Sequence, residues 1–201
     1  MRGRRLAGTA MIVAGAALLT AAAGDVARAA VARDAARAEW DRRLAREAVV
    51  AVERAARGGY ELAAPRRGTP VARLRVPRLG LDEIVVEGVG DAELRAGPGH
   101  LPGSAFPGDS GNSVISAHRD RHFRALGKLA IGDTVETETL AGPARWVVTK
   151  RTIVRRGRPA LFSTAEPVLT LTTCWPIQAL GPAPERLLYE ARLLPVAAAD
   201  L

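Results

Sequence analysis

The chain has 201 residues, which is enough for one domain of ordinary size and some additional segments. Hydrophobic residues make up 48% and charged residues 25% of the chain, and this balance excludes a wholly disordered protein. The formal net charge is +8, supplied almost entirely by arginines that are scattered from end to end, since the only lysines are Lys128 and Lys150. Aromatic residues are only 4%, too few for base-stacking platforms, so we expect no nucleic-acid partner.

The N-terminal segment is apolar after an arginine-rich start. A run without a charged residue extends from Leu6 to Gly24, and about 20 such residues cross a bilayer. Arginines before such a segment stay in the cytoplasm. The sequence therefore predicts a cytoplasmic tail over 1–5, a single membrane anchor over 6–24, and an extracytoplasmic remainder. A cleaved signal peptide is the alternative, because three alanines at 21–23 offer a cleavage site, and it exports the remainder as well.

A helical segment follows the apolar run. Residues 25–57 are rich in Ala, Arg and Glu and contain no Pro or Gly, and Gly58-Gly59 is expected to end the helix. Residues 60–70 contain prolines and glycine among arginines and are typical of a linker. We therefore expect a stalk and linker over 25–70, although the apolar face of the helix can equally pack on the domain. That face carries a residue every fourth position: Trp40, Leu44, Ala48 and Val52.

From Val71 to Leu194 the chain changes to short β-like runs separated by Gly- and Pro-rich turns. In 168–173, Leu169 and Leu171 alternate with threonines, as expected for a strand with two different faces. Many short strands with such punctuation predict a β-barrel or a sandwich. A short helix is expected over 122–129 and a C-terminal tail over 195–201. The expected strands are 71–76, 82–87, 113–117, 145–154, 168–173 and 186–194.

Two catalytic-type residues, His118 and Cys174, stand at the ends of predicted strands. Cys174 is the only cysteine, which excludes an internal disulfide and a multi-cysteine zinc site. A cysteine nucleophile requires a thiolate and a nearby proton carrier, and histidine titrates close to neutrality. Such partners are distant in sequence and adjacent in space. The residue types alone leave open that Cys174 is an inert buried thiol.

Three segments together resemble the sortase family. The segment Thr170-Leu-Thr-Thr-Cys174 resembles the TLxTC signature of sortases, and the segment from Asn112 through His118-Arg-Asp120 resembles their histidine segment. The run that begins at Glu185-Arg186 is similar to the last strand of the family, which opens with a catalytic arginine. The resemblance covers residues 71–194, the expected catalytic domain. It is to the class D-like branch, in particular the proteobacterial type with Cys-Trp-Pro after the strand.

The resemblance implies an all-β fold, namely an eight-stranded closed or nearly closed barrel, and a cysteine transpeptidase. Cys174 is then the nucleophile, His118 the proton carrier and Arg186 the residue that stabilises charge on the substrate. The substrate is an exported protein with an LPxTG-like C-terminal sorting signal, and a thioacyl-enzyme passes its acyl group to an amine acceptor. Because guanidinium stays charged at neutral pH, Arg186 donates hydrogen bonds and carries no proton.

Other residues near these motifs have possible supporting or competing roles. Arg192 and Arg119 are rivals of Arg186: Arg192 lies well into the last strand, and Arg119 is expected to point away from the histidine side. Asp120 either orients His118 or binds a turn backbone. Thr173 fits the interior of the signature and is a possible supporting residue.

We expect neither a cofactor nor a metal. His118 and His122 form an H-x3-H pair, but structural zinc requires four ligands and no third one is close in sequence. His100, in a Gly/Pro-rich stretch, is expected to be a solvated loop histidine, and Trp175 is expected to pack on the barrel. Two alternative functions stay open, a cysteine hydrolase of the same fold and a non-catalytic exported β-domain. An L,D-transpeptidase is excluded because its Ser-His-Gly-Cys segment is absent.

Overall fold

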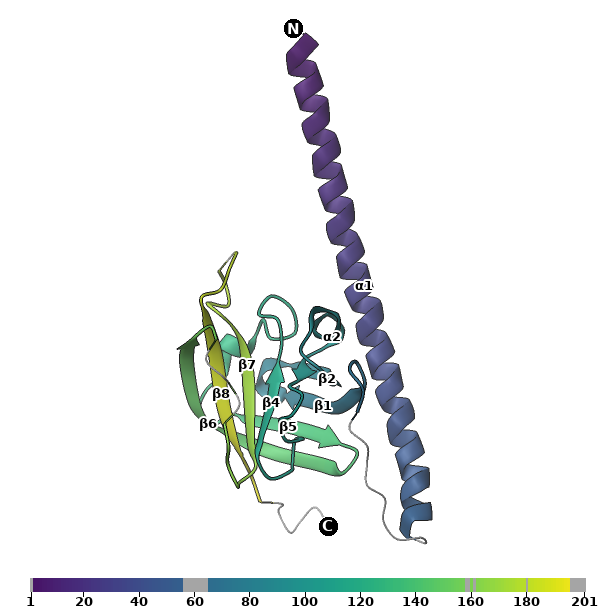
Figure 1. Ribbon diagram of the computed structural model, residues 1–201, viewed down its shortest axis with the longest axis vertical. Helices are drawn as coiled ribbons and strands as arrows, with labels where there is room; N and C mark the ends of the chain where they lie inside the picture. Colours follow the sequence, from purple (N-terminus) through teal and green to yellow (C-terminus); the bar gives the residue numbers. More distant parts are fainter. Residues whose placement is uncertain (1, 56–64, 158–159, 161, 180, 196–201) are drawn as a thin grey trace.

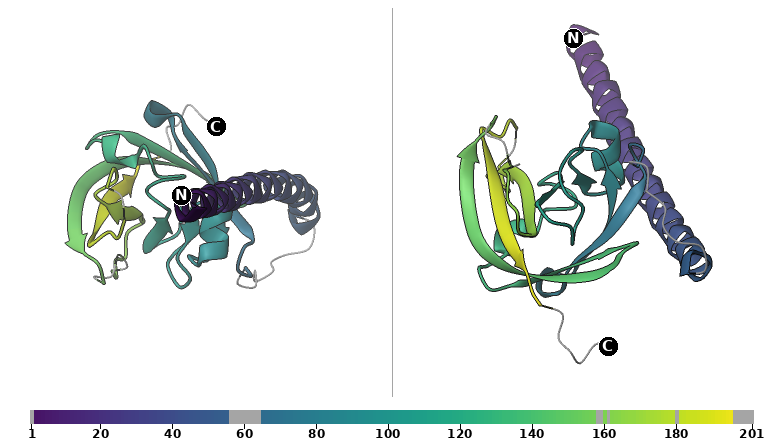
Figure 2. Two further views of the ribbon diagram at one scale, coloured as in Figure 1. Left: turned by 90° about the horizontal axis from the view of Figure 1, so that it is seen from above. Right: turned by 60° about the horizontal axis from the view of Figure 1, so that its bottom comes forward.

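The computed structural model describes residues 2–55, 65–157, 160, 162–179 and 181–195, and within the N-terminal helix it describes the side chains of residues 11–47. A closed β-barrel lies beside one long helix, α1 (Arg2–Ala55), which runs along the outside of the barrel wall (Figures 1 and 2). The predicted end of the helix at Gly58-Gly59 and most of the predicted linker lie outside the described residues.

The barrel has eight strands in the order β1-β2-β3-β4-β7-β8-β6-β5, which confirms the predicted eight-stranded closed barrel. Two neighbouring pairs, β2 with β3 and β4 with β7, are parallel. The remaining pairs are antiparallel. The strands are β1 (Pro70–Val76), β2 (Leu81–Glu87), β3 (Gly99–His100), β4 (Asn112–Ser116), β5 (Thr134–Thr139), β6 (Gly142–Arg155), β7 (Val168–Trp175) and β8 (Glu185–Leu193).

The six predicted strands all exist, and two further strands and one helix were not predicted. The strand β3 contains only two residues, and β5 (TVETET) has a single apolar position, Val135, so neither has a readable alternation. The helix that was not predicted, α2 (Asp91–Ala96), has only 6 residues. The helix predicted over 122–129 was wrong, since only a 3-10 turn at Leu126–Lys128 forms there.

Apolar side chains from the inner faces of the strands fill the barrel. Leu169 and Leu171 of β7 point into this core, as their alternation predicts. The threonines of the opposite face, Thr170 and Thr172, are also buried, however. Thr170 Oγ1 donates a hydrogen bond of 2.8 Å to Asn112 Oδ1, and Asn112 Nδ2 donates to the carbonyl of Ala160 at 3.0 Å. The strand that leads to Cys174 is therefore buried, and the polar group of Thr170 on its outer face is hydrogen-bonded.

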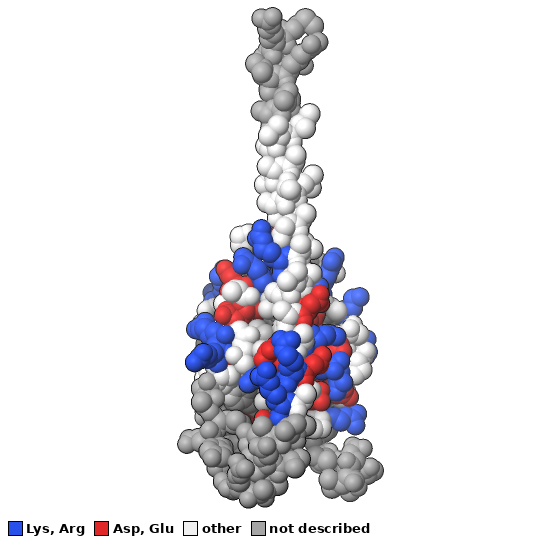
Figure 3. Space-filling model, turned by 90° about the vertical axis from the view of Figure 1, so that its right-hand side faces the viewer, with Lys and Arg blue, Asp and Glu red and all other residues white. Residues whose placement is uncertain are grey.

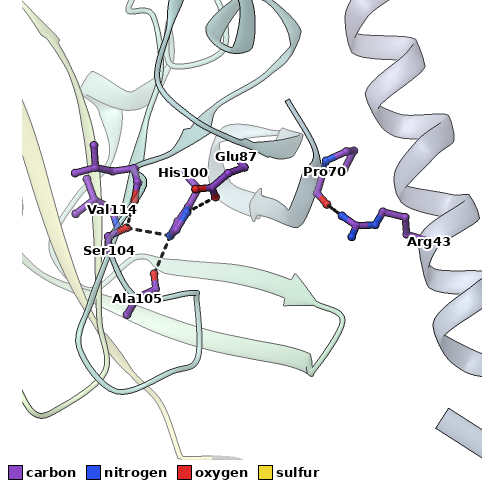
Figure 4. Close-up of polar contacts among 8 residues, drawn as sticks. Arg43, Pro70, Glu87, His100, Ser104, Ala105 and Val114 are labelled. Atoms are coloured by element: carbon purple, nitrogen blue, oxygen red, sulfur yellow. Dashed lines mark hydrogen bonds and ion pairs between the residues drawn. The ribbon is translucent and has the colours of Figure 1, made fainter. Parts of the chain in front are cut away.

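The helix α1 packs on the barrel, so its apolar face has a partner. Ala36 and Trp40 are buried against Ile84 and Val86 of β2, with Leu44 at the edge of the cluster. The other two residues of the predicted face, at 48 and 52, lie outside the described side chains. Arginines add hydrogen bonds to the barrel backbone: Arg37 donates to the carbonyl of Asp82 at 3.0 Å, and Arg43 donates to the carbonyl of Pro70 (Figure 4).

The N-terminal part of α1 extends beyond the barrel. Within Met11–Glu47, the part of the helix whose side chains are described, an 18-residue window with a mean hydropathy of 1.4 is long and apolar enough to cross a membrane, although an N-terminal signal sequence meets the same criterion. The projecting side chains are exposed, for example Leu18 at 71% and Leu19 at 74%. Figure 3 shows an uncharged surface along this part of the helix, with charged residues beginning where the barrel begins. The described part of the apolar run, residues 11–24, is therefore free of the barrel.

His100 is buried, so the prediction of a solvated loop histidine was wrong. It belongs to β3 and is 1% exposed. Its Nδ1 lies 2.7 Å from Glu87 Oε2, and its Nε2 lies 2.9 Å from both Ser104 Oγ and the carbonyl oxygen of Ala105 (Figure 4). These contacts satisfy the polar ring inside the protein and hold the chain after β3, because a buried polar group must be hydrogen-bonded to be tolerated.

Candidate active site

Strand register brings Cys174 and Arg186 together. The two residues are direct partners in the antiparallel β7–β8 ladder. Directly opposed residues in such a ladder have Cβ atoms about 5 Å apart, so their side chains interact on one face. The Arg186 guanidinium donates a hydrogen bond to Cys174 Sγ through its Nη1. A charged hydrogen-bond donor therefore stands directly beside the cysteine sulfur.

His118 is brought to the same end of the barrel by the neighbouring strand. In the parallel β4–β7 pair, Ser116 is the partner of Thr172, and the Ala117 amide continues the pairing with a 3.2 Å bond to the Thr172 carbonyl. His118 and Cys174 each lie two residues beyond this last pair. They therefore emerge from adjacent strands at the same level. No hydrogen bond joins the His118 ring to Cys174 within the described part of the chain.

A hydrogen bond of Thr173 joins the segment of Cys174 to the segment of His118. Its Oγ1 donates a 2.8 Å hydrogen bond to the carbonyl of Ala117, the residue before His118. Thr173 is 1% exposed and Ala117 is 3% exposed. The bond thus joins the residues that immediately precede His118 and Cys174, in a place where water cannot substitute for either partner.

Burial lowers the pKa of His118. Desolvation is the largest cause, and the charges of Arg121 and His122 lower the pKa further, while Asp120 and Asp91 raise it. The His118 pKa lies below 6.5 as a result, so the imidazole is mainly neutral at neutral pH. A neutral imidazole can accept the proton of the Cys174 thiol.

A small cavity adjoins Arg186. It has a volume of about 150 Å³ and follows the outer faces of β4, β7 and β8. A second, more open cavity of about 600 Å³ adjoins Asn112 at the other end of β4. The smaller cavity is lined mainly by apolar and hydroxyl side chains, among them Val114, Ser116, Thr172 and Leu188.

Comparison with known proteins identifies the family of the chain. The sortase domain model matches residues 74–194, which include His118, Cys174 and Arg186. The chain belongs to the sortase family. It is 31% identical over 132 residues to sortase D of Bacillus subtilis (strain 168), an alignment that covers 64% of this chain and 67% of that protein. This sortase is therefore a cysteine transpeptidase that processes sorting signals, and its similarity to sortase D fits a class D-like type.

Solved sortase structures share the fold. A Clostridium perfringens sortase D5 transpeptidase superposes with a TM-score of 0.60 at 23% identity, covering 66% of this chain and 83% of that one. Sortase C1 from Streptococcus suis also gives a TM-score of 0.60, at 24% identity, covering 66% and 76%.

The two rival arginines lie in other places in this sortase. Arg192 is exposed and is paired with Val168, at the end of β7 opposite to Cys174. Arg119 donates to the carbonyl of Pro176 at 2.7 Å and to that of Gly181, so it binds the loop that follows Cys174. Sequence reasoning missed this contact because no local signal specifies which distant loop an arginine reaches.

The remaining sequence-predicted residues have the following surroundings. Asp120 is exposed and acts on His118 through its charge. His122 Nδ1 lies 3.2 Å from Glu83 Oε1, and no cluster of three or more metal-ligating side chains occurs among the described residues. Trp175 packs against the barrel core, and the Arg151 guanidinium lies 5.1 Å from its ring centroid.

Proposed function

We propose that Cys174 is the nucleophile of this sortase, His118 its proton carrier and Arg186 the donor that stabilises charge on the substrate. The observation that carries this assignment is the hydrogen bond from Arg186 to Cys174 Sγ across the β7–β8 ladder. The Thr173–Ala117 bond supports the inclusion of His118, because it ties the two strand ends from which His118 and Cys174 emerge. Thr173 and Asp120 take supporting roles, Thr173 by fixing this geometry and Asp120 by its charge near His118.

In the first half-reaction, Cys174 Sγ attacks a backbone carbonyl of the sorting signal while its proton passes to His118. The carbonyl oxygen becomes an oxyanion, and Arg186 turns its donors from the sulfur to this oxygen. The intermediate then collapses by breaking the C–N bond, and the His118 imidazolium gives its proton to the leaving amine. The product is a thioacyl-enzyme on Cys174.

In the second half-reaction, an acceptor amine attacks the thioacyl carbonyl carbon. His118 removes a proton from the amine, Arg186 again stabilises the oxyanion, and the C–S bond breaks. The proton returns from His118 to the departing sulfur, so the enzyme is regenerated and a new amide is formed. Water as acceptor would make the same site a hydrolase, which is the alternative that the residues alone leave open.

The sorting signal is proposed to bind along β4. The cavity beside Arg186 is narrow and mainly apolar, which suits an extended peptide with small and aliphatic side chains. The motif expected there is LPxTG-like, on an exported protein. Residues 71–194 form the catalytic domain in this proposal, and residues 195–201 are a tail.

We further propose that residues 6–24 form an uncleaved membrane anchor and residues 1–5 a cytoplasmic tail. Residues 25–70, the stalk and linker, would then lie outside the cytoplasm together with the barrel. The support is the uncharged run that projects beyond the barrel and the arginines that precede it. A stalk that packs on the barrel, as α1 does, places the catalytic domain close to the membrane.

The assignment is tested by product analysis with the full chain in detergent. Candidate C-terminal peptides are incubated with and without an added amine, and products are separated by mass spectrometry. Transfer of the peptide to the amine supports a transpeptidase, whereas only hydrolysed peptide at a saturating amine concentration identifies the hydrolase. The Cys174→Ala variant should yield neither product, and product formation by this variant would contradict the assignment.

A further inference from the structure

Most side chains of the segment after His118, residues 119–123, contact other parts of the chain. Phe123 is fully buried in the barrel core. His122 pairs with Glu83 of β2, and Arg119 binds the loop after Cys174. His118 itself accepts backbone hydrogen bonds from this segment, including one of 3.1 Å from the Phe123 amide. The placement of the His118 ring therefore depends on how firmly the segment is held.

The remaining contact of the segment reaches the N-terminal helix. Arg121 donates a hydrogen bond to Asp25 Oδ2 of α1. The other carboxylate oxygen of Asp25 lies 3.6 Å from the Arg95 Nε of α2. One carboxylate thus joins three elements, α1, α2 and the segment after His118. Asp25 lies outside the region that the sortase domain model matches, residues 74–194.

The helix presents this carboxylate from a fixed position. About three to four turns after Asp25, Ala36 and Trp40 are buried against β2, and Trp40 is 0% exposed. Because a helix is stiff over this length, docking at Trp40 fixes where Asp25 stands. Figure 1 shows the first part of α1 leaving the barrel at the end where α2 and the loop after β4 lie. Asp25 therefore lies at the end of the barrel that carries His118 and Cys174.

We propose that Asp25 of the N-terminal helix is a positioning residue for His118, acting through its contacts with Arg121 and Arg95. The inference rests on the proposed role of His118 as the proton carrier. The Asp25 carboxylate fixes the segment after His118 and the helix α2 relative to each other. Through α1, the part of the chain that anchors the protein thereby completes the catalytic site.

The charges around His118 explain why this contact affects its chemistry. The charged or titratable groups that act on the ring are Asp120, Arg121 and His122 of its own segment and Asp91 of α2. Asp25 holds both of these elements. Removing its charge leaves the Arg121 guanidinium uncompensated beside the ring, and an uncompensated cation disfavours the imidazolium. Loss of the contact also frees the segment to move, and small displacements of catalytic groups are costly.

The test compares full-length Asp25→Asn, Asp25→Glu and Asp34→Asn with the wild type. Asp34 is exposed on the same helix, so Asp34→Asn makes the same charge change away from the site. We expect Asp25→Asn to lower kcat about tenfold with KM nearly unchanged, and to move the acid limb of the pH–rate profile to lower pH. Asp25→Glu should recover most of the rate, and Asp34→Asn should match the wild type.

A second measurement needs no peptide substrate. Because Cys174 is the only cysteine, its alkylation by a neutral haloacetamide reports on the site directly. The pH profile of alkylation should change in Asp25→Asn and not in Asp34→Asn. If Asp25→Asn matches Asp34→Asn in kcat and in alkylation, the positioning role is wrong, even if thermal stability falls. If the wild type transfers no peptide but the alkylation profiles still differ, the proposed function fails and the positioning role stands.

Discussion

The Thr173 hydroxyl and the Ala117 carbonyl join the strand that carries the proposed nucleophile to the strand that leads to His118. The bond is buried on both sides. It therefore sets the relative height of Cys174 and His118 at the end of the barrel without entering the chemistry.

Removing this hydroxyl should weaken both the fold and the rate. In Thr173→Val the shape is retained but the buried Ala117 carbonyl loses its partner, which costs about 1–3 kcal/mol of unfolding free energy. We expect kcat to fall as well, while Thr173→Ser, which retains the donor, stays close to wild type. Denaturant unfolding and peptide transfer measure the two effects. Wild-type stability and rate in Thr173→Val would show that the bond does not organise the site.

Arg186 should be far more important for the rate than Arg192. Losing one donor to the oxyanion typically costs about 10²–10³ in kcat, so Arg186→Ala should be strongly impaired. Arg186→Lys keeps the charge without the planar guanidinium and should recover only part of the rate. Arg192→Ala should be mild, because Arg192 is exposed at the opposite end of the strand pair.

The comparison of these three variants uses one peptide, with circular dichroism as a check of folding. A low rate in Arg192→Ala together with a normal rate in Arg186→Ala would show that Arg192, and not Arg186, is the third catalytic residue. Normal rates in all three variants would show that neither arginine stabilises the oxyanion, so that backbone N–H groups must do so.

The pH dependence should follow the lowered pKa of His118. If His118 is the proton carrier, its neutral imidazole persists to lower pH than that of an ordinary histidine, because burial disfavours the charged ring. We therefore expect the acid limb of the kcat/KM profile to lie at lower pH than an ordinary histidine would give. Asp120 raises the pKa of His118, so Asp120→Asn should move this decline to still lower pH. An acid limb whose midpoint lies at or above the usual histidine pKa of 6.5, or an opposite shift in Asp120→Asn, would contradict this prediction.

The docked helix predicts where the barrel lies relative to a membrane. Asp25 follows the proposed anchor directly and contacts the segment after His118, so Cys174 should lie near the lipid surface. Leu140, in the β5–β6 turn, instead packs in the cluster that contains Trp40 and Leu44. At 1.5 Å per residue, Leu44 is about 28 Å farther along α1 than Asp25.

The full chain can be placed in vesicles with a quencher on the lipid headgroups. A fluorophore on Cys174 should be quenched more strongly than one on Ala141→Cys, prepared in a Cys174→Ala background. Equal quenching at both positions would refute the predicted orientation. A protein released from the membrane with a new N-terminus near Gly24 would instead establish the cleaved signal peptide.

Much of the barrel could be predicted from the sequence because its longer strands carry readable patterns. In β7 the alternation of Leu169 and Leu171 with threonines locates a strand that ends near Cys174. The two-residue β3 has no such pattern, because it forms only by pairing with β2 and β4. His100 was placed in solvent for the same reason: its partner Glu87 belongs to another strand.

The proposed catalytic residues, and Thr173 and Asp120 as possible supporting residues, were found through motifs, whereas Arg121 and Asp25 were not. Cys174 and Arg186 stand in recognisable segments, and the barrel register pairs them. Arg121 looks like any surface arginine in an arginine-rich chain, and Asp25 looks like the first charge after an apolar run. Their contact depends on how α1 docks, which the periodicity of the helix alone could not distinguish from a free stalk.

The central claim, that Cys174 acts as a nucleophile on a sorting signal, is tested most directly by trapping the intermediate. The full-length protein is mixed with a sorting-signal peptide in the absence of an amine, quenched in acid, and digested for mass spectrometry. We predict a mass increase equal to the acyl fragment on the peptide that contains Cys174, and no increase in Cys174→Ala. Cleavage of the peptide without an adduct on Cys174, or with an adduct on another residue, would contradict the assignment.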